Sequence, residues 1–195
     1  MNKTSSSTRL LFTLAIAFAL SGAHSMHAQQ TPTTPAAATP PATPPSPQVD
    51  ATLDSMRGGS RTLRGERGHR VVVLFFGDRP HVEDNNALKG ALRRFVVDNH
   101  LDARVALYGV ADLESVGSVP ETLVRTMIQP LVDRWNTDIL LDWHGVMRRA
   151  PFNFPTYQST IAIVDLEGRI VWRREGELDA GGTRDFYRAL RGALR

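Results

Sequence analysis

The segment from Ser159 to Leu178, STIAIVDLEGRIVWRREGEL, constrains the fold more than any other part of the chain. Thr160 to Asp165 is an apolar run, and Ile170 to Arg173 is a second one. The acidic turn between them contains Gly168, which can adopt the positive φ that a tight turn needs. The segment therefore predicts an antiparallel hairpin in which the turn residues Asp165 and Gly168 have structural roles.

Three further strands are predicted before this hairpin, at residues 70–76, 104–112 and 138–143. The first, RVVVLFF, is continuously apolar and rich in β-branched residues, which is typical of a central strand buried on both faces. A turn with Asp142 as its capping residue is predicted after the third strand, with Gly145 free to adopt an unusual φ.

Two predicted helices separate these strands, and a third ends the chain. The first helix presents an apolar face made by Leu88, Ala91, Leu92, Phe95 and Val96. In the second, the repeat of every four residues predicts a buried face of Leu123, Met127, Leu131 and Trp135, with a kink or break at Pro130. The third is predicted to begin at Thr183, a good N-cap, and to pack through Phe186, Ala189, Leu190, Ala193 and Leu194.

The order β-α-β-α-β, hairpin, helix predicts an α/β fold. Crossover helices imply parallel strands, and the hairpin adds an antiparallel pair. We therefore expect a three-layer α/β/α sandwich with a central mixed sheet and helices on both faces.

Two segments precede this domain. Residues 1–28 have the order of a secretory signal: Lys3 and Arg9, then the apolar run Leu10–Leu20, then small residues that allow cleavage after Ala23 or Ala28. The apolar run is too short for a stable membrane span. Residues 29–49 hold seven of the 12 prolines, with Thr and Ala between them, and predict a disordered linker. Residues 50–195 are the predicted folded domain.

Composition excludes several classes of function. The formal net charge is +3 and the charges are mixed along the chain, so nucleic acid is not an expected partner. The chain has no cysteine, which excludes disulfides and every reaction of a thiolate, including disulfide exchange and thiol peroxidase chemistry.

The segments RVVVLFFGD, RVALYGVAD, DILLDWHGV and the hairpin together resemble the thioredoxin-like superfamily, in its redoxin and peroxiredoxin-like branch. The run DNNALKGAL and the serine at the start of the hairpin are similar to the YtfJ-like family of small exported bacterial proteins. The resemblance covers about residues 70–194. It implies a thioredoxin-like fold, but Pro80 and Glu83 stand where redox cysteines would be, and Ser159 replaces the facing proline.

Polar side chains crowd the loop after the first predicted strand: Asp78, Arg79, His81, Glu83 and Asp84. In open α/β sheets, ligands bind outside the carboxyl ends of strands, so a ligand or partner site is expected here, opposite Tyr157 and Ser159. His81, Glu83 and Asp84 are possible metal ligands, and Ser159 with His81 is a possible nucleophile and base. A solvated helix start is the simpler interpretation of the loop.

We therefore expect an exported, periplasmic or secreted protein without a cofactor, which binds an envelope protein or peptide and does no redox chemistry. The alternatives are a hydrolytic or metal-dependent enzyme that uses residues 78–84, and a purely structural module. The apolar loop with Phe152, Phe154 and Tyr157 is either a partner surface or part of the core.

Overall fold

The computed structural model describes residues 47–195, which contain one seven-stranded sheet with the order β2-β1-β5-β4-β3-β6-β7. The strands are β1 (Thr52–Ser55), β2 (Ser60–Thr62), β3 (Val71–Gly77), β4 (Val105–Asp112), β5 (Asp138–Asp142), β6 (Thr160–Val164) and β7 (Ile170–Glu175). The predicted signal (1–28) and almost all of the predicted linker (29–49) lie outside the described residues.

Strand β3 is central, as its apolar sequence predicts. It pairs in parallel with β4 and antiparallel with β6, and β6 pairs antiparallel with β7. Asp165 accepts hydrogen bonds from the backbone N–H groups of Glu167 and Arg169, and Gly168 has a φ of 80°. The mixed sheet, the hairpin and the structural role of its turn are confirmed.

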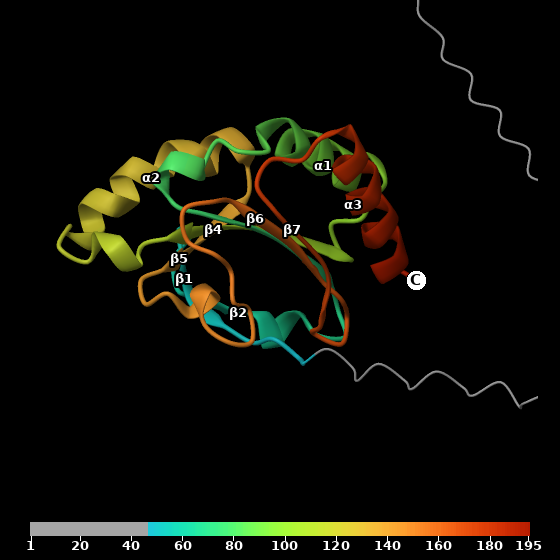
Figure 1. Cartoon of the computed structure of the whole chain (residues 1–195), viewed down its shortest axis with the longest axis horizontal. Helices are drawn as coiled ribbons and strands as arrows, with labels where there is room; N and C mark the ends of the chain where they lie inside the picture. Colours follow the sequence, from blue (N-terminus) through green and yellow to red (C-terminus); the bar gives the residue numbers. More distant parts are fainter. Residues whose placement is uncertain (1–46) are drawn as a thin grey trace, which may run out of the picture. The chain divides into compact units, whose positions relative to one another are not determined.

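The helices α1 (Asn86–Asp98), α2 (Glu121–Trp135) and α3 (Ala180–Ala193) all lie on one face of the sheet (Figure 1). Because β3, β4 and β5 are neighbours in chain order, two right-handed crossovers place α1 and α2 on the same side. On this side, Val71 and Val73 pack with α1 and α3, and Ile139 packs with α2.

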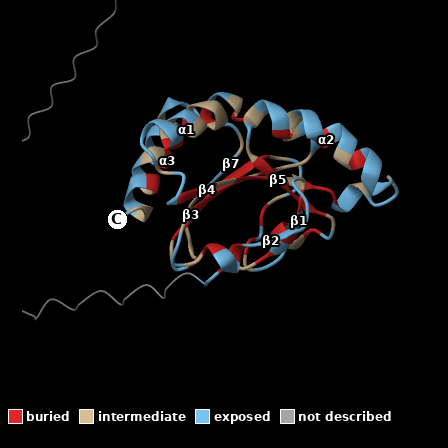
Figure 2. Cartoon of the chain, turned by 180° about the vertical axis from the view of Figure 1, so that it is seen from behind, coloured by how far each residue is buried: buried red, intermediate tan, exposed pale blue. Residues whose placement is uncertain are grey.

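Short 3-10 helices and irregular chain cover the opposite face (Figure 2). Val72 and Leu74 point to this side and pack with Leu63, Phe152 and Phe154. We expected helices on this second face, and in their place lie the short 3-10 elements η1 (Leu63–Glu66) and η4 (Val146–Arg148). The fold class itself is confirmed. Phe152 and Phe154 are 1% and 2% exposed, so their loop is part of the core.

The sheet begins before the first predicted strand. No element was predicted for residues 50–69, yet β1 and β2 form a hairpin there, and β1 pairs antiparallel with β5. Gln48 forms a β-bridge with Arg169, and Val49 is 2% exposed in the core. The folded part thus includes two residues ahead of the expected start at Asp50.

Two details of the helices differ from the predictions. Helix α2 buries Val124, Ile128 and Val132, whereas Leu123 and Met127 of the predicted face are half-exposed. It also continues through Pro130, which lies on the exposed side where water can reach the carbonyl that loses its hydrogen bond. Helix α3 begins at Ala180, because the side chain of Asp179, not Thr183, caps it by accepting from the Gly182 N–H at 2.6 Å.

Candidate functional site

A cleft of about 770 Å³ lies on the helical face of the sheet, and residues of both α1 and α2 line it. Its floor includes Phe75, Gly109 and Ile139 from the three parallel strands. Gly109 keeps the floor low, because a Cβ atom at this position would lie 3.2 Å from the Ile139 Cγ1 atom. The volume is in the range typical of small-molecule and peptide side-chain sites.

The mouth of the cleft is where the sequence predicts a site, at the carboxyl ends of β3 and β4. Six of the seven predicted residues line the cleft: Asp78, Arg79, His81, Asp84, Tyr157 and Ser159. Glu83 does not. Its carboxylate accepts a hydrogen bond from the Asn86 side chain and forms an ion pair with Arg134 of α2 at 2.9 Å. The sequence therefore correctly predicted that residues 78–84 and residues 157–159, which are far apart along the chain, lie at the same cleft.

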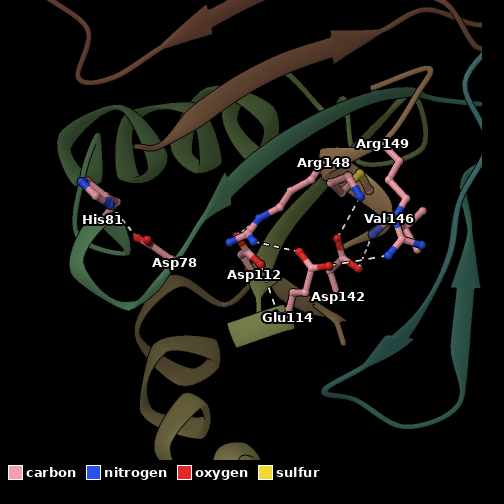
Figure 3. Close-up of polar contacts among 9 residues, drawn as sticks. Asp78, His81, Asp112, Glu114, Asp142, Val146, Arg148 and Arg149 are labelled. Atoms are coloured by element: carbon pink, nitrogen blue, oxygen red, sulfur yellow. Dashed lines mark hydrogen bonds and ion pairs between the residues drawn. The ribbon is translucent and has the colours of Figure 1, made fainter. Parts of the chain in front are cut away.

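Asp78 and His81 form a pair at this mouth (Figure 3). Asp78 precedes the 3-10 helix η2 (Arg79–His81), whose tight turn brings the imidazole Nδ1 atom to 2.5 Å from the carboxylate. A histidine held by a carboxylate can accept a proton. However, the Ser159 hydroxyl has no hydrogen-bond partner in residues 47–195, so the predicted serine–histidine contact is absent there.

Two buried hydroxyls at the cleft are unpaired. Ser159 is 4% exposed and Thr160 is fully buried, and neither side-chain oxygen makes a hydrogen bond within the described chain. Both residues line the cleft. A buried hydroxyl without a partner costs free energy, and such groups are rare in folded proteins. These two atoms are therefore well suited to hydrogen-bond a bound ligand.

Helix α2 supplies an apolar wall that the sequence did not assign to the site. Met127, Leu131 and Trp135 line the cleft, together with Val119 from the preceding loop. Met127 is 48% exposed and Tyr157, at the mouth, is 80% exposed. Large apolar side chains that are exposed beside a concave apolar surface are typical of a binding site.

Lys89 of α1 is a further cleft residue that sequence reasoning missed. Its ammonium group lies 4.2 Å from the centre of the Trp135 ring and 5.8 Å from that of Phe75, and donates to the Val82 carbonyl at 2.7 Å. Burial lowers the pKa of Lys89 to about 8, and the carboxylates of Glu83 and Asp84 oppose this shift. The local sequence ALKGAL does not indicate that Lys89 belongs to a site, because the cleft forms only when α2 packs beside α1.

A second polar cluster lies where β4 and β5 end (Figure 3). Asp112, which is 3% exposed, accepts from the Arg148 guanidinium at 2.8 Å, and Arg148 also binds Glu114 at 2.8 Å. Burial raises the pKa of Asp112, and the hydrogen bond from Arg148 opposes the rise. The contacts join β4 to η4, which indicates a structural role.

Asp142 belongs to the same region and is fully buried. Its carboxylate accepts from the N–H groups of Val146 at 2.8 Å and Met147 at 2.9 Å, and Gly145 has a φ of 62°. The predicted turn is confirmed. His144 is exposed, and its side chain makes no hydrogen bond within residues 47–195.

The candidate metal ligands do not converge. Across the part of the chain that the structure describes, no group of three or more histidine and acidic side chains is placed to hold a metal ion. Glu83, one of the three residues considered, is turned toward Arg134.

In residues 47–195, no helix is long and apolar enough to span a membrane.

Solved structures define the class of fold. The chain is similar to Etrx1, an exposed lipoprotein thioredoxin from Streptococcus pneumoniae strain TIGR4, with a TM-score of 0.55 and 19% identity over 74% of this chain and 99% of that one. It is also similar to StoA from Bacillus subtilis, with a TM-score of 0.51 and 16% identity over 75% and 99%. A thiol-disulfide oxidoreductase from Bacteroides fragilis matches with a TM-score of 0.51 and 15% identity over 73% and 98%.

These likenesses show the fold and no more. The protein is a cysteine-free protein with a thioredoxin-like fold, whose cleft lies between α1 and α2. No protein-family model matches the sequence, and no curated protein matches it.

Proposed function

We propose that the protein is an exported, non-redox binding protein of the cell envelope, of the YtfJ-like kind, and that its cleft receives an apolar segment of a partner protein or peptide. The observation that carries the proposal is the cleft itself. It is walled by apolar side chains of α2, and two unpaired hydroxyls lie at its edge.

The rim of the cleft favours a ligand that is larger than the cleft. Met127 and Tyr157 both line the cleft and expose large apolar side chains. A peptide with an aromatic or aliphatic side chain in the cleft would cover both. Burial of this surface contributes about 25 cal/mol per Å² of apolar area.

The polar groups at the mouth suit a peptide backbone. The hydroxyls of Ser159 and Thr160 can each donate a hydrogen bond to a carbonyl or accept one from an N–H group. Asp78 and Arg79 add charge at the rim, where it sets orientation more than affinity.

Export is supported by the order of charge, apolar run and small residues in positions 1–28. It is also supported by the likeness to Etrx1, which is an exposed lipoprotein. We place the protein in the periplasm or outside the cell on this basis, with residues 29–46 as a spacer that precedes the folded domain.

Affinity selection from a library of random peptides about 12 residues long tests the proposal. Selected peptides should carry aromatic or aliphatic side chains, and their affinity is then measured by calorimetry with two matched variants. Met127 and Leu123 are 48% and 50% exposed on the same helix, but only Met127 lines the cleft. Met127→Asp should weaken binding at least about tenfold, because it puts a charge into the apolar wall.

Leu123→Asp is the control and should leave the affinity within about twofold of the wild type. If the two variants weaken binding equally, the cleft is not a peptide-binding site and the proposal is wrong. The same holds if no peptide is enriched relative to a parallel selection on an unrelated folded protein.

A further inference from the structure

The cleft holds the only lysine of the described chain. The whole sequence contains 21 arginines but two lysines, Lys3 and Lys89. Arginine remains protonated in proteins, whereas lysine can lose its proton when it is buried. Among the basic side chains that line the cleft in the described chain, Arg79, His81 and Lys89, only Lys89 can become a neutral amine.

The surroundings of Lys89 are apolar on two sides. Its Nζ atom lies between the rings of Phe75 from β3 and Trp135 from α2. Its one hydrogen bond in residues 47–195 is donated to the Val82 carbonyl, which leaves two donors and, after deprotonation, a lone pair.

The charged groups near Lys89 do not neutralise it by a direct contact. Glu83 and Asp84, in the loop before α1, attract its charge over a longer distance. Glu83 forms its ion pair with Arg134 of α2. Strand β3 contributes the Phe75 ring. Because burial lowers its pKa to about 8, a larger fraction of Lys89 is neutral at about pH 7.5 than of an ordinary lysine.

We propose that Lys89 is a reactive amine that captures apolar aldehydes and ketones as an imine inside the cleft. The neutral Nζ atom attacks the carbonyl carbon, and one proton passes from the nitrogen to the carbonyl oxygen to give a neutral carbinolamine. Loss of water then forms the C=N bond. The step needs no oxidant or reductant, and water reverses it.

The cleft selects the class of carbonyl compound. Leu131, Trp135 and Phe75 would pack against an aliphatic or aromatic chain, and a polar acid such as glyoxylate would gain nothing from them. This reaction goes beyond the reversible peptide binding proposed above, although it uses the same wall of the cleft.

Reductive trapping tests the proposal. The purified protein is incubated with hexanal and cyanoborohydride at about pH 7.5, and the alkylated amines are located by peptide mass spectrometry. Lys89 should be labelled at least about tenfold faster than the side chain of Nα-acetyl-lysine amide under the same conditions, because more of it is neutral. Glyoxylate, which gains from the neutral amine but not from the apolar wall, should show a smaller advantage over the same reference amine.

Lys89→Arg is the matched variant, since it keeps the charge and cannot form an imine. It should lose this adduct and keep its thermal transition by circular dichroism. Labelling of Lys89 no faster than that of Nα-acetyl-lysine amide, in protein whose thermal transition shows that it is folded, overturns the proposal. An advantage over this reference amine that is equal with hexanal and with glyoxylate also overturns it.

The two proposals fail separately. If selected peptides bind but Lys89 shows no enhanced labelling, only the amine chemistry is wrong. If Lys89 is labelled rapidly but no peptide binds, the reactive amine remains and the peptide-binding function is lost.

Discussion

The ammonium group of Lys89 lies 4.2 Å from the centre of the Trp135 ring and so connects the first turn of α1 to the last residue of α2. The loop before α1 is also connected to α2, by the ion pair between Glu83 and Arg134. A cation–π contact and an ion pair therefore link the start of α1 and the loop before it to the end of α2.

The buried amine predicts a pH dependence of stability. A lysine with its pKa lowered from 10.5 to about 8 binds fewer protons in the folded state than in the unfolded state between these values. Stability therefore rises with pH across this window. We expect the free energy of unfolding of the wild type, minus that of Lys89→Met, to rise by up to about 3 kcal/mol between about pH 8 and pH 10.5.

Urea unfolding of both proteins at several pH values measures this difference, and subtraction removes the contributions of tyrosines that titrate in the same range. A difference that does not change with pH would show that Lys89 is an ordinary, solvated lysine.

The buried face of α2 is tested by two alanine variants. Ile128 is 9% exposed and packs toward β5, whereas Leu123 is 50% exposed. Ile128→Ala should lower the free energy of unfolding by about 3 kcal/mol, and Leu123→Ala by less than about 0.5 kcal/mol. If urea unfolding shows a larger loss of stability for Leu123→Ala than for Ile128→Ala, the buried face of α2 is the one predicted from the sequence.

The turn after β5 depends on Asp142. Asp142→Ala leaves the N–H groups of Val146 and Met147 without an acceptor, and we expect a loss of about 3 kcal/mol. Asp142→Asn keeps an acceptor and should cost about 1 kcal/mol. Equal losses in the two variants would mean that the charge of Asp142, rather than its hydrogen bonds, stabilises the turn.

The pair of Asp112 and Arg148 should show the cost of an unpaired buried charge. Arg148→Ala leaves Asp112 buried without its cation and should cost about 3 kcal/mol at pH 7. The double variant Asp112→Asn, Arg148→Met removes both charges and should be destabilised by about 1 kcal/mol or less.

The cost of Arg148→Ala should also depend on pH. A carboxyl whose pKa is raised in the folded state favours folding at low pH and loses this contribution as the pH rises through the folded pKa. Removal of Arg148 raises the pKa of Asp112 further, so the loss in the variant should be smaller at about pH 4 than at pH 7. A loss that is equal at both pH values contradicts this account.

The sequence predicted the strands better than the helix faces. The run Val71–Phe76 has no alternative to a buried strand, whereas α2 carries two apolar stripes side by side. Leu123, Met127 and Leu131 form one, and Val124, Ile128 and Val132 form the other. Periodicity is the same for both, and only the position of β5 decides which one is buried.

Short or ambiguous signals explain the other differences. Strands β1 and β2 are four and three residues long and largely polar, so they have no recognisable pattern. Asp179 and Thr183 are both good N-caps, so the sequence alone does not decide between them.

The candidate site was partly predictable for a similar reason. The loop from Asp78 to Asp84 follows a central strand, and the carboxyl ends of such strands are a general place for sites. The apolar wall and Lys89 come from side chains of two helices, whose approach is set by tertiary packing and leaves no local pattern in the sequence.

The central claim is that the space between α1 and α2 is the binding site of this protein. Titration of a selected peptide into the ¹⁵N-labelled protein, followed by amide chemical shifts, tests it most directly. The account predicts that the largest shifts fall in residues 77–89, 124–135 and 157–161. Shifts that concentrate around β2, η1 and Val171, with none near Lys89 and Trp135, would contradict it.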